Sequence, residues 1–146
     1  MSTSTAGPVV DGQLISAHPA TGSEIGRFPV ADTDVVHTAV ALARETQAWW
    51  SGLDFAERKR LLLACKAEMT RCGKELVTLL RNETGKSVSD ALTEISTCFE
   101  HLAWAPRNAK RVLGRHRKRA SLTLIDHAGY VEYQPYGVVA VIGPWN

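Results

Sequence analysis

Apolar residues near the start of the chain come in short stretches that turn residues separate. Val9 and Val10 precede Asp11-Gly12, and Leu14 and Ile15 follow it. Asp-Gly between apolar pairs is typical of a tight β-hairpin. A second turn, His18-Pro19-Ala20-Thr21-Gly22, comes before an apolar stretch from Glu24 to Val30. We therefore predict short strands at 9–10, 14–15 and 24–30.

A helical period then takes over and continues to Gly114. Asp32 or Thr33 can cap the first helix, which is expected to end near Trp50. Asp54 followed by Glu57 resembles a capping box, and Gly85 stands where a C-terminal glycine belongs. A second helix is expected after Asp54, with an apolar stripe of Leu61, Leu62, Cys65 and Met69. Gly73 interrupts it, a short helix runs through Leu76, Leu79 and Leu80, and the longest helix begins near Ser87.

The long helix carries one apolar stripe and one proline. Val88, Leu92, Ile95, Phe99 and Leu102 recur at steps of four and three, which indicates a single buried face. Proline removes a backbone donor and clashes with the preceding turn. We therefore expect Pro106 to kink or break this helix, or to begin a second helix through Val112.

After Gly114 the period changes to that of strands. Residues 122–125 and 130–133 are predicted strands, with a turn at 126–129. The unbroken apolar run Val138 to Ile142 is typical of a strand buried on both faces of a parallel sheet. A parallel neighbour needs a crossover of a dozen or more residues, and only four residues follow Ile142. The sequence thus predicts an α/β fold that is mostly helical here and whose sheet is incomplete.

Composition excludes few functions. The 146 residues are 45% apolar and 22% charged, with a net charge of +2. No apolar run approaches the roughly 20 residues of a membrane span, and the chain start lacks the pattern of a signal peptide. We therefore expect a cytoplasmic protein without membrane attachment. Three cysteines without a CxxC pair, and five histidines without a shared spacing, predict reduced thiols and no metal site.

One segment is strongly basic. Residues 107–119 hold seven Lys or Arg and no acid. Such a segment can bind nucleic acid or an anionic surface. The interpretation we favour is a solvated face with cations at a helix C-terminus, where the helix dipole stabilises them.

Four local patterns together resemble the NAD(P)-dependent aldehyde dehydrogenase family. The turn at 18–22 resembles the family's NPATG, with His18 in place of Asn. Trp49-Trp50 followed by Glu57-Arg58 resembles its tryptophan and E-R stretch, and residues 83–86 match its ETGK. Tyr133 to Asn146 matches the family's P-x-G-V-V-x-V-I-x-P-W-N strand and turn, which is the most specific of the four. The resemblance runs from about Val9 onward and covers the first third of a full member.

The resemblance implies a mechanism and a set of site residues. In the family, a cysteine thiolate attacks the aldehyde, hydride passes to NAD or NADP, and a glutamate activates water to release the acid. The residue that matches the asparagine donor to the substrate oxygen is Asn146. A preorganised neutral donor stabilises the negative charge that this oxygen gains. The residues that match the cofactor-lining segment are Ile142, Gly143, Pro144 and Trp145, of which Trp145 could equally be core.

The family's cysteine and glutamate lie beyond the residues present, and Cys65, Cys72 and Cys98 are interpreted as packing residues. We therefore expect a fragment that is inactive alone. The expected divisions are a disordered tail (1–8), a helical part of the cofactor domain (9–114), a two-stranded segment that forms a homo-oligomer (115–134) and the first Rossmann-like strand with its PWN turn (135–146). The alternative is a non-catalytic binding module or partner subunit that uses the basic segment 107–119.

Overall fold

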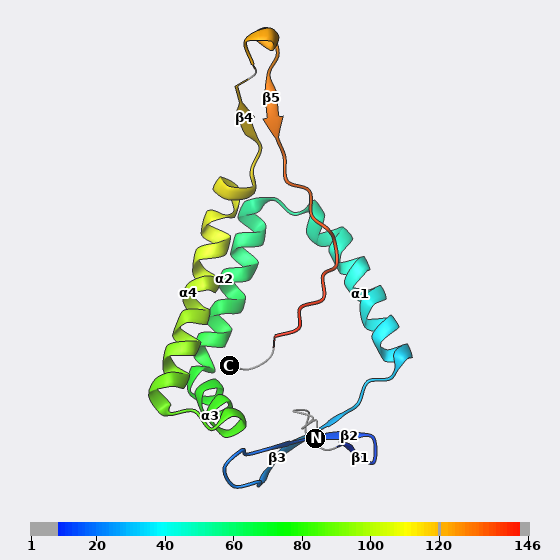
Figure 1. Cartoon of the computed structure of the whole chain (residues 1–146), viewed down its shortest axis with the longest axis vertical. Helices are drawn as coiled ribbons and strands as arrows, with labels where there is room; N and C mark the ends of the chain where they lie inside the picture. The colour runs from blue at the N-terminus through cyan, green and yellow to red at the C-terminus, as the bar shows by residue number, and fades with distance from the viewer. Residues whose placement is uncertain (1–8, 120, 144–146) are drawn as a thin grey trace.

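The computed structural model describes residues 9–119 and 121–143, so the tail predicted for residues 1–8 lies outside it. Three strands, four helices, a short 3-10 turn and a two-stranded hairpin follow one another (Figure 1). Their bounds are β1 (Val9–Val10), β2 (Gln13–Ala17), β3 (Glu24–Pro29), α1 (Thr33–Gly52), α2 (Phe55–Arg71), α3 (Gly73–Thr84), α4 (Val88–Leu113), β4 (His116–Lys118), η1 (Leu122–Leu124) and β5 (Gly129–Val131).

The first three strands form an antiparallel sheet in the order β1-β2-β3. Asp11 and Gly12 connect β1 to β2 with φ angles of 51° and 74°. Two positive φ angles are the mark of a type I′ turn, so the predicted hairpin is confirmed. On β3, Arg27 donates two hydrogen bonds of 2.8 Å to the Glu24 carboxylate. These bonds hold the pKa of Glu24 below its ordinary value.

The predicted helix ends are confirmed by their caps. The Asp32 carboxylate accepts a hydrogen bond of 2.9 Å from Val35 N–H at the start of α1. At α2, Glu57 N–H donates to Asp54 at 2.8 Å and Asp54 N–H donates to Glu57 at 3.2 Å. This is the reciprocal capping box that the sequence predicts. Gly85 ends α3 at a left-handed φ of 72°.

Two of the outcomes expected at Pro106, a break and the start of a new helix, do not occur in the long helix α4. One helix runs from Val88 to Leu113 with Pro106 inside it, so the proline neither breaks the helix nor begins a new one. Proline removes a single i→i−4 bond, and the turns on either side keep theirs. Pro106 is also one of the two buried residues of α4. Its packing offsets part of the cost of the lost bond.

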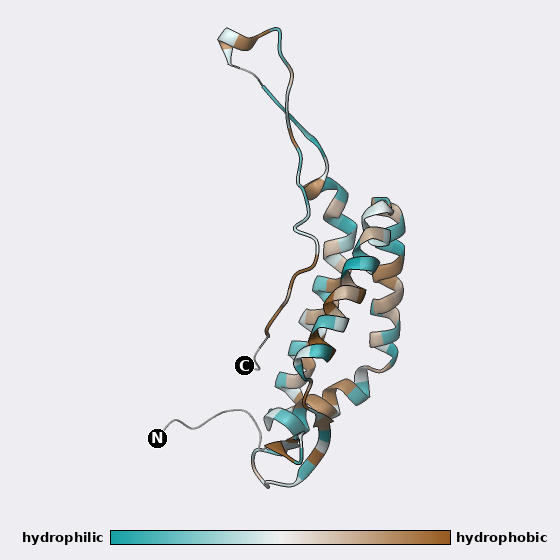
Figure 2. Ribbon diagram, turned by 90° about the vertical axis from the view of Figure 1, so that its right-hand side faces the viewer, coloured by the Kyte–Doolittle hydropathy of each residue, from teal (hydrophilic) through white to brown (hydrophobic). Residues whose placement is uncertain are grey.

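The helices α2, α3 and α4 pack together, whereas α1 makes at most weak contacts with the other described elements. Figure 1 shows α1 standing apart from the α2–α4 pair. Among the described residues, Ala91 is the only fully buried apolar residue. Figure 2 shows hydrophobic and hydrophilic residues interspersed along the helices. The described chain therefore lacks the enclosed core that a domain of this length usually has.

Two of the family-like motifs meet at the junction of β2 and α3. The Ser16 hydroxyl donates to the Glu83 carboxylate at 3.2 Å, which ties the first sheet to the helices. A Cβ built on Gly85 would lie 3.1 Å from Pro19 Cγ, so the turn at 18–22 sits directly against the end of α3. Lys86 forms an ion pair with Glu94 of α4. Lys86 thus ties the connection after α3 to α4.

The third motif, Trp49-Trp50 with Glu57-Arg58, lies at the junction between α1 and α2. The Arg58 guanidinium lies 6.0 Å from the centre of the Trp50 ring and 5.8 Å from that of Phe55. It donates a hydrogen bond of 3.0 Å to the Ser51 carbonyl oxygen. These contacts join the end of α1 to the start of α2. Arg58 is therefore a structural residue of the connection.

The hairpin after α4 differs in its details from the prediction. Its strands are β4 and β5, with Arg117 opposite Tyr130. Residues 122–125, predicted as a strand, instead form the 3-10 turn η1 and its end at the hairpin tip. At the base, Arg115 pairs with Glu132 at 2.9 Å and its guanidinium lies 3.8 Å from the centre of the Tyr130 ring. Apolar composition alone does not make a segment a strand, because the segment must also pair with a neighbouring strand.

The apolar run 138–142 also differs from its prediction, since no strand is assigned there. Val139, Val141 and Ile142 have exposed fractions of 65%, 87% and 93%. A strand is defined by hydrogen bonds to a neighbour, and the described part of the chain supplies no neighbour at this place.

Candidate functional site

The expected site lies on the segment that follows β5. This segment leaves the hairpin and turns back along the helices (Figures 1 and 2). Of the expected site residues, Ile142 and Gly143 are described and both are exposed. Pro144, Trp145 and Asn146 lie outside the described residues.

The described residues leave room beside the expected cofactor segment. A Cβ built on Gly143 would meet no atom within 4 Å. The backbone there is open to a ligand, and Gly143 is a residue type that permits a close approach. Apart from its chain neighbours, Gly143 thus has open space on the side where a Cβ would lie.

The start of the segment meets a hollow on α1 that sequence reasoning did not find. Gly137 and Val138 line this hollow of roughly 500 Å³ together with residues of α1. The α1 residues are Ala39, Leu42, Ala43, Thr46, Gln47 and Trp50. The helical period of α1 indicates an apolar face, but nothing in the sequence says that residue 137 lies beside it.

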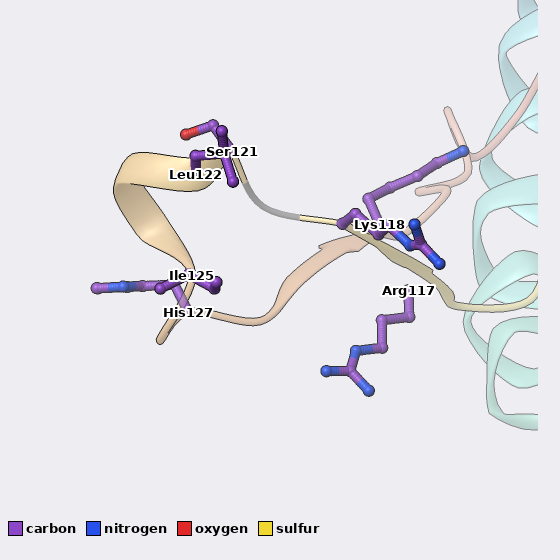
Figure 3. A pocket seen from close by; sticks show the side chains of 7 residues that line it. Arg117, Lys118, Ser121, Leu122, Ile125 and His127 are labelled. Atoms are coloured by element: carbon purple, nitrogen blue, oxygen red, sulfur yellow. The ribbon is translucent and has the colours of Figure 1, made fainter.

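A second hollow lies at the hairpin, within the basic segment. Arg117, Lys118 and Arg119 line it together with Ser121, Leu122, Ile125 and His127. Figure 3 shows Leu122, Ile125 and His127 at the turn, with Arg117 and Lys118 toward the helices. The tip is strongly apolar, because Leu122 is 90% exposed and Ile125 is 81% exposed. The hairpin therefore combines a cationic stem with an apolar end.

The structure marks none of the three cysteines as a catalytic residue. All three are free; Cys65 and Cys98 are exposed, and Cys72 is half-buried between α2 and α3. The expectation that Cys65 and Cys98 are packing residues is wrong, because both are exposed. On α2, the neighbouring residue Lys66 faces α4 instead, and its ammonium lies 5.8 Å from the centre of the Phe99 ring. No cluster of three metal-ligating side chains occurs within residues 9–119 and 121–143.

Comparison with known proteins decides the family. The model of the aldehyde dehydrogenase family matches residues 10–146, which is nearly the whole chain. The chain belongs to the aldehyde dehydrogenase family. The resemblance that the four sequence motifs indicate is thereby confirmed. None of the helices in the described ranges combines the length and apolarity that crossing a bilayer requires.

Individual relatives agree with this result. The chain is 33% identical to the N-succinylglutamate 5-semialdehyde dehydrogenase 1 of Caulobacter vibrioides, over 92% of its own length and 28% of that protein. It is 31% identical to the aldehyde dehydrogenase-like protein C21C3 of Schizosaccharomyces pombe, over 88% of its length and 25% of that protein. The chain therefore spans about a quarter of the length of these curated relatives.

Solved structures share the fold. The crystal structure of PnpE in complex with nicotinamide adenine dinucleotide matches 76% of this chain with a TM-score of 0.68 and 27% identity. The matched part is 23% of the PnpE chain. A benzaldehyde dehydrogenase from Corynebacterium glutamicum also reaches a TM-score of 0.68 at 21% identity, which supports the fold alone. The mostly helical arrangement described above is thus the amino-terminal part of an aldehyde dehydrogenase fold.

Proposed function

We propose that this chain supplies part of the active site of an oxidoreductase that oxidises an aldehyde to a carboxylic acid with NAD or NADP. The observation that carries the proposal is the family match through residue 146, which includes the PWN turn. Asn146 is the donor to the substrate oxygen, and Ile142 to Trp145 line the cofactor. PnpE, whose structure contains NAD, and a D-glyceraldehyde dehydrogenase from Thermoplasma acidophilum, which is named for NADP, support a nicotinamide cofactor.

The chain alone is inactive in this proposal. Its resemblance assigns the nucleophilic cysteine and the base to residues that the chain does not contain, and its own free cysteines lie on helices or between them. The bound cofactor would accept hydride from the substrate carbon. The residues of this chain would hold the nicotinamide end and donate the Asn146 amide N–H to the oxygen as negative charge develops there.

The hairpin 115–134 forms a homo-oligomer contact in this proposal, while residues 9–114 and 135–146 belong to the cofactor domain. The exposed apolar tip of the hairpin supports that role, since a protruding apolar surface is typical of a subunit interface. The three free cysteines suit a reducing cytoplasm.

The test joins residues 1–146 to the remaining part of the Caulobacter relative in one polypeptide. Asn146→Ala in this chimera is expected to lower turnover about 100- to 1000-fold, because one donor to the oxyanion is lost. Cofactor affinity should stay unchanged, since the amide faces the substrate. Asn146→Asp should be at least as damaging, because a carboxylate repels the developing charge.

Steady-state turnover and cofactor binding are measured for each variant, with the unjoined chain as the control without activity. Retention of most turnover by Asn146→Ala, or a loss that comes mainly from cofactor binding, would show that the assigned role is wrong. Aldehyde-dependent reduction of cofactor by residues 1–146 alone would contradict the proposed inactivity of the chain.

A further inference from the structure

Charge is distributed unevenly along the chain. Residues 107–119 hold seven Lys or Arg and no acid, whereas the other 133 residues hold 10 Lys or Arg against 15 Asp or Glu. The seven cations follow one another through the end of α4, the connection after it, β4 and the residue after β4. We call them the basic strip: Arg107, Lys110, Arg111, Arg115, Arg117, Lys118 and Arg119.

The cations of the basic strip are open to solvent. All seven residues are exposed. Within the described residues, only Arg115 has an acidic partner, which is Glu132 at 2.9 Å. Figure 3 shows the side chains of Arg117 and Lys118 extending away from the hairpin backbone. Because like charges at this density repel one another, the strip favours an anionic partner that neutralises them.

The helix dipole accounts for only part of the strip. It stabilises cations in the last turn of a helix, which in α4 holds Lys110 and Arg111. Arg107 lies before that turn, and residues 115–119 follow the end of the helix. The proposed subunit contact rests on the apolar tip of the hairpin, which contains none of these cations. Arg107 and the cations of 115–119 therefore need another explanation.

Exposed aromatic rings border the strip at two places. Trp104 of α4 is 56% exposed. Asn108 links it to the strip, because its Nδ2 donates to the Trp104 carbonyl oxygen at 2.8 Å and its Oδ1 accepts from Arg111 at 2.9 Å. On the hairpin, Arg117 lies opposite Tyr130, which is 48% exposed. Cations and half-exposed rings thus lie next to each other on both α4 and the hairpin.

This combination favours a single-stranded nucleic acid over other anionic partners. Five of the seven cations are arginines, whose planar guanidinium binds phosphate through two hydrogen bonds and stacks on rings. Aromatic side chains stack on bases, and an unpaired strand leaves the faces of its bases accessible. A membrane surface also offers phosphates, but it has no flat rings on which Trp104 and Tyr130 could stack.

We propose that the basic strip binds single-stranded nucleic acid, with phosphates on the cations and bases stacked on Trp104 and Tyr130. This function is separate from aldehyde oxidation, because the strip contains none of the expected site residues at 142–146. Contacts with the phosphate backbone do not depend on base sequence and weaken as salt is added. The binding is therefore independent of sequence and sensitive to salt.

The test uses the full chain and a fluorescent single strand of about 16 thymidine nucleotides, the upper site size of small single-strand binding folds. Fluorescence anisotropy gives the binding constant over a series of salt concentrations. If about five phosphates are neutralised, the logarithm of the binding constant should fall against the logarithm of the salt concentration with a slope of about −3.5. The absence of binding at low salt, or a slope near zero, would overturn the proposal.

Two triple variants separate the place of the charges from the net charge. One replaces three cations of the strip with alanine, and the other replaces three exposed cations of α2 and α3. The first should bind about tenfold or more weakly and lower the slope by about 2, whereas the second should change both much less. Equal effects would overturn the proposal. The variants are Arg117→Ala with Lys118→Ala and Arg119→Ala, and Lys59→Ala with Arg60→Ala and Lys74→Ala.

Two tryptophans of equal exposure test the stacking. Trp104 is 56% exposed and Trp49, on α1, is 57% exposed. Trp104→Leu should weaken binding about tenfold and leave the salt slope unchanged, because stacking on a base releases no counterions. Trp49→Leu should leave binding almost unchanged. Equal binding by the two variants would contradict the role of Trp104 in the proposal.

Other anionic partners are distinguished by the same anisotropy experiment. Unlabelled competitors are the same single strand, a duplex of equal length and vesicles that contain phosphatidylserine. The single strand should compete best at equal phosphate concentration, because neither paired bases nor lipid headgroups can stack on the rings. Better competition by the duplex or by the vesicles would overturn the proposal.

Discussion

Gly85 offers a direct test of the contact between the 18–22 turn and the end of α3. Gly85 has a φ of 72°, and an added Cβ would lie 3.1 Å from Pro19 Cγ. Gly22 has a nearly equal φ of 70°, but an added Cβ there would meet nothing within 4 Å. The two glycines therefore differ in their surroundings while sharing their backbone conformation.

The expected magnitudes follow from this difference. A non-glycine residue in the left-handed region costs about 1–2 kcal/mol, partly offset by the lower entropy of the unfolded chain. Gly22→Ala should thus destabilise the fold by about 1 kcal/mol. Gly85→Ala has the same backbone cost and an additional cost of overpacking. This additional cost is about 1 kcal/mol, the low end of the usual range, because the added Cβ meets only one ring atom. The ring has little freedom to retreat, since Gly22 N–H donates to the His18 carbonyl oxygen at 2.8 Å and holds the turn.

The assay is urea unfolding of the full chain, followed by its helical circular dichroism. Gly85→Ala should lose about 2 kcal/mol of unfolding free energy, against about 1 for Gly22→Ala. Combining Gly85→Ala with Pro19→Ala should remove most of the difference between the two glycines. Equal losses for Gly85→Ala and Gly22→Ala, or no recovery in the double variant, would refute the packing of the two motifs against each other.

Two further predictions concern the helix cap and the hairpin. Asp54→Ala removes an acceptor that binds Glu57 N–H at 2.8 Å and should cost about 1 kcal/mol of unfolding free energy in the same urea experiment; an unchanged midpoint would contradict it. Leu122→Asp together with Ile125→Asp should dissociate the oligomer of the active chimera without changing its helix content, as measured by light scattering and circular dichroism. An oligomer of unchanged mass would show that the hairpin tip is not the contact.

The elements that the sequence predicts correctly are those that depend on near neighbours. The Asp11-Gly12 turn, the Asp54–Glu57 box and the left-handed Gly85 each involve residues within about four positions. Residue type at such positions largely decides the local backbone. The bounds of α1 and α2 follow for the same reason.

The elements that the sequence predicts wrongly depend on distant or unseen neighbours. Residues 122–125 have the composition of a strand, but β5 pairs with residues 116–118 instead. Residues 122–125 therefore lie unpaired at the tip of the hairpin. The helix α4 runs unbroken through Pro106, which is buried there, and the helix pattern does not reveal that burial. Likewise, the exposed position of Cys65 depends on the face of α2 that α4 covers.

The candidate site was predictable only through its motif. Composition and period indicate a buried strand at 138–142, yet nothing in them assigns a role to Asn146. The PWN turn supplies that role by resemblance, and the family match includes the same residues. The hollow on α1 was missed because it joins two segments that lie about 90 residues apart.

Helices and strands differ in what they require from the rest of a protein, and this difference explains how the chain presents its site. A helix satisfies its interior backbone groups within one segment, so α2, α3 and α4 form from the described chain, and α4 continues through Pro106. A strand forms its hydrogen bonds with a neighbouring strand. The described residues supply no such neighbour for the run 138–142, so it is unpaired and Ile142 is 93% exposed. The turn that would aim Asn146 follows directly from that run. The position of the proposed donor therefore depends on the pairing of the run 138–142 with a neighbouring strand.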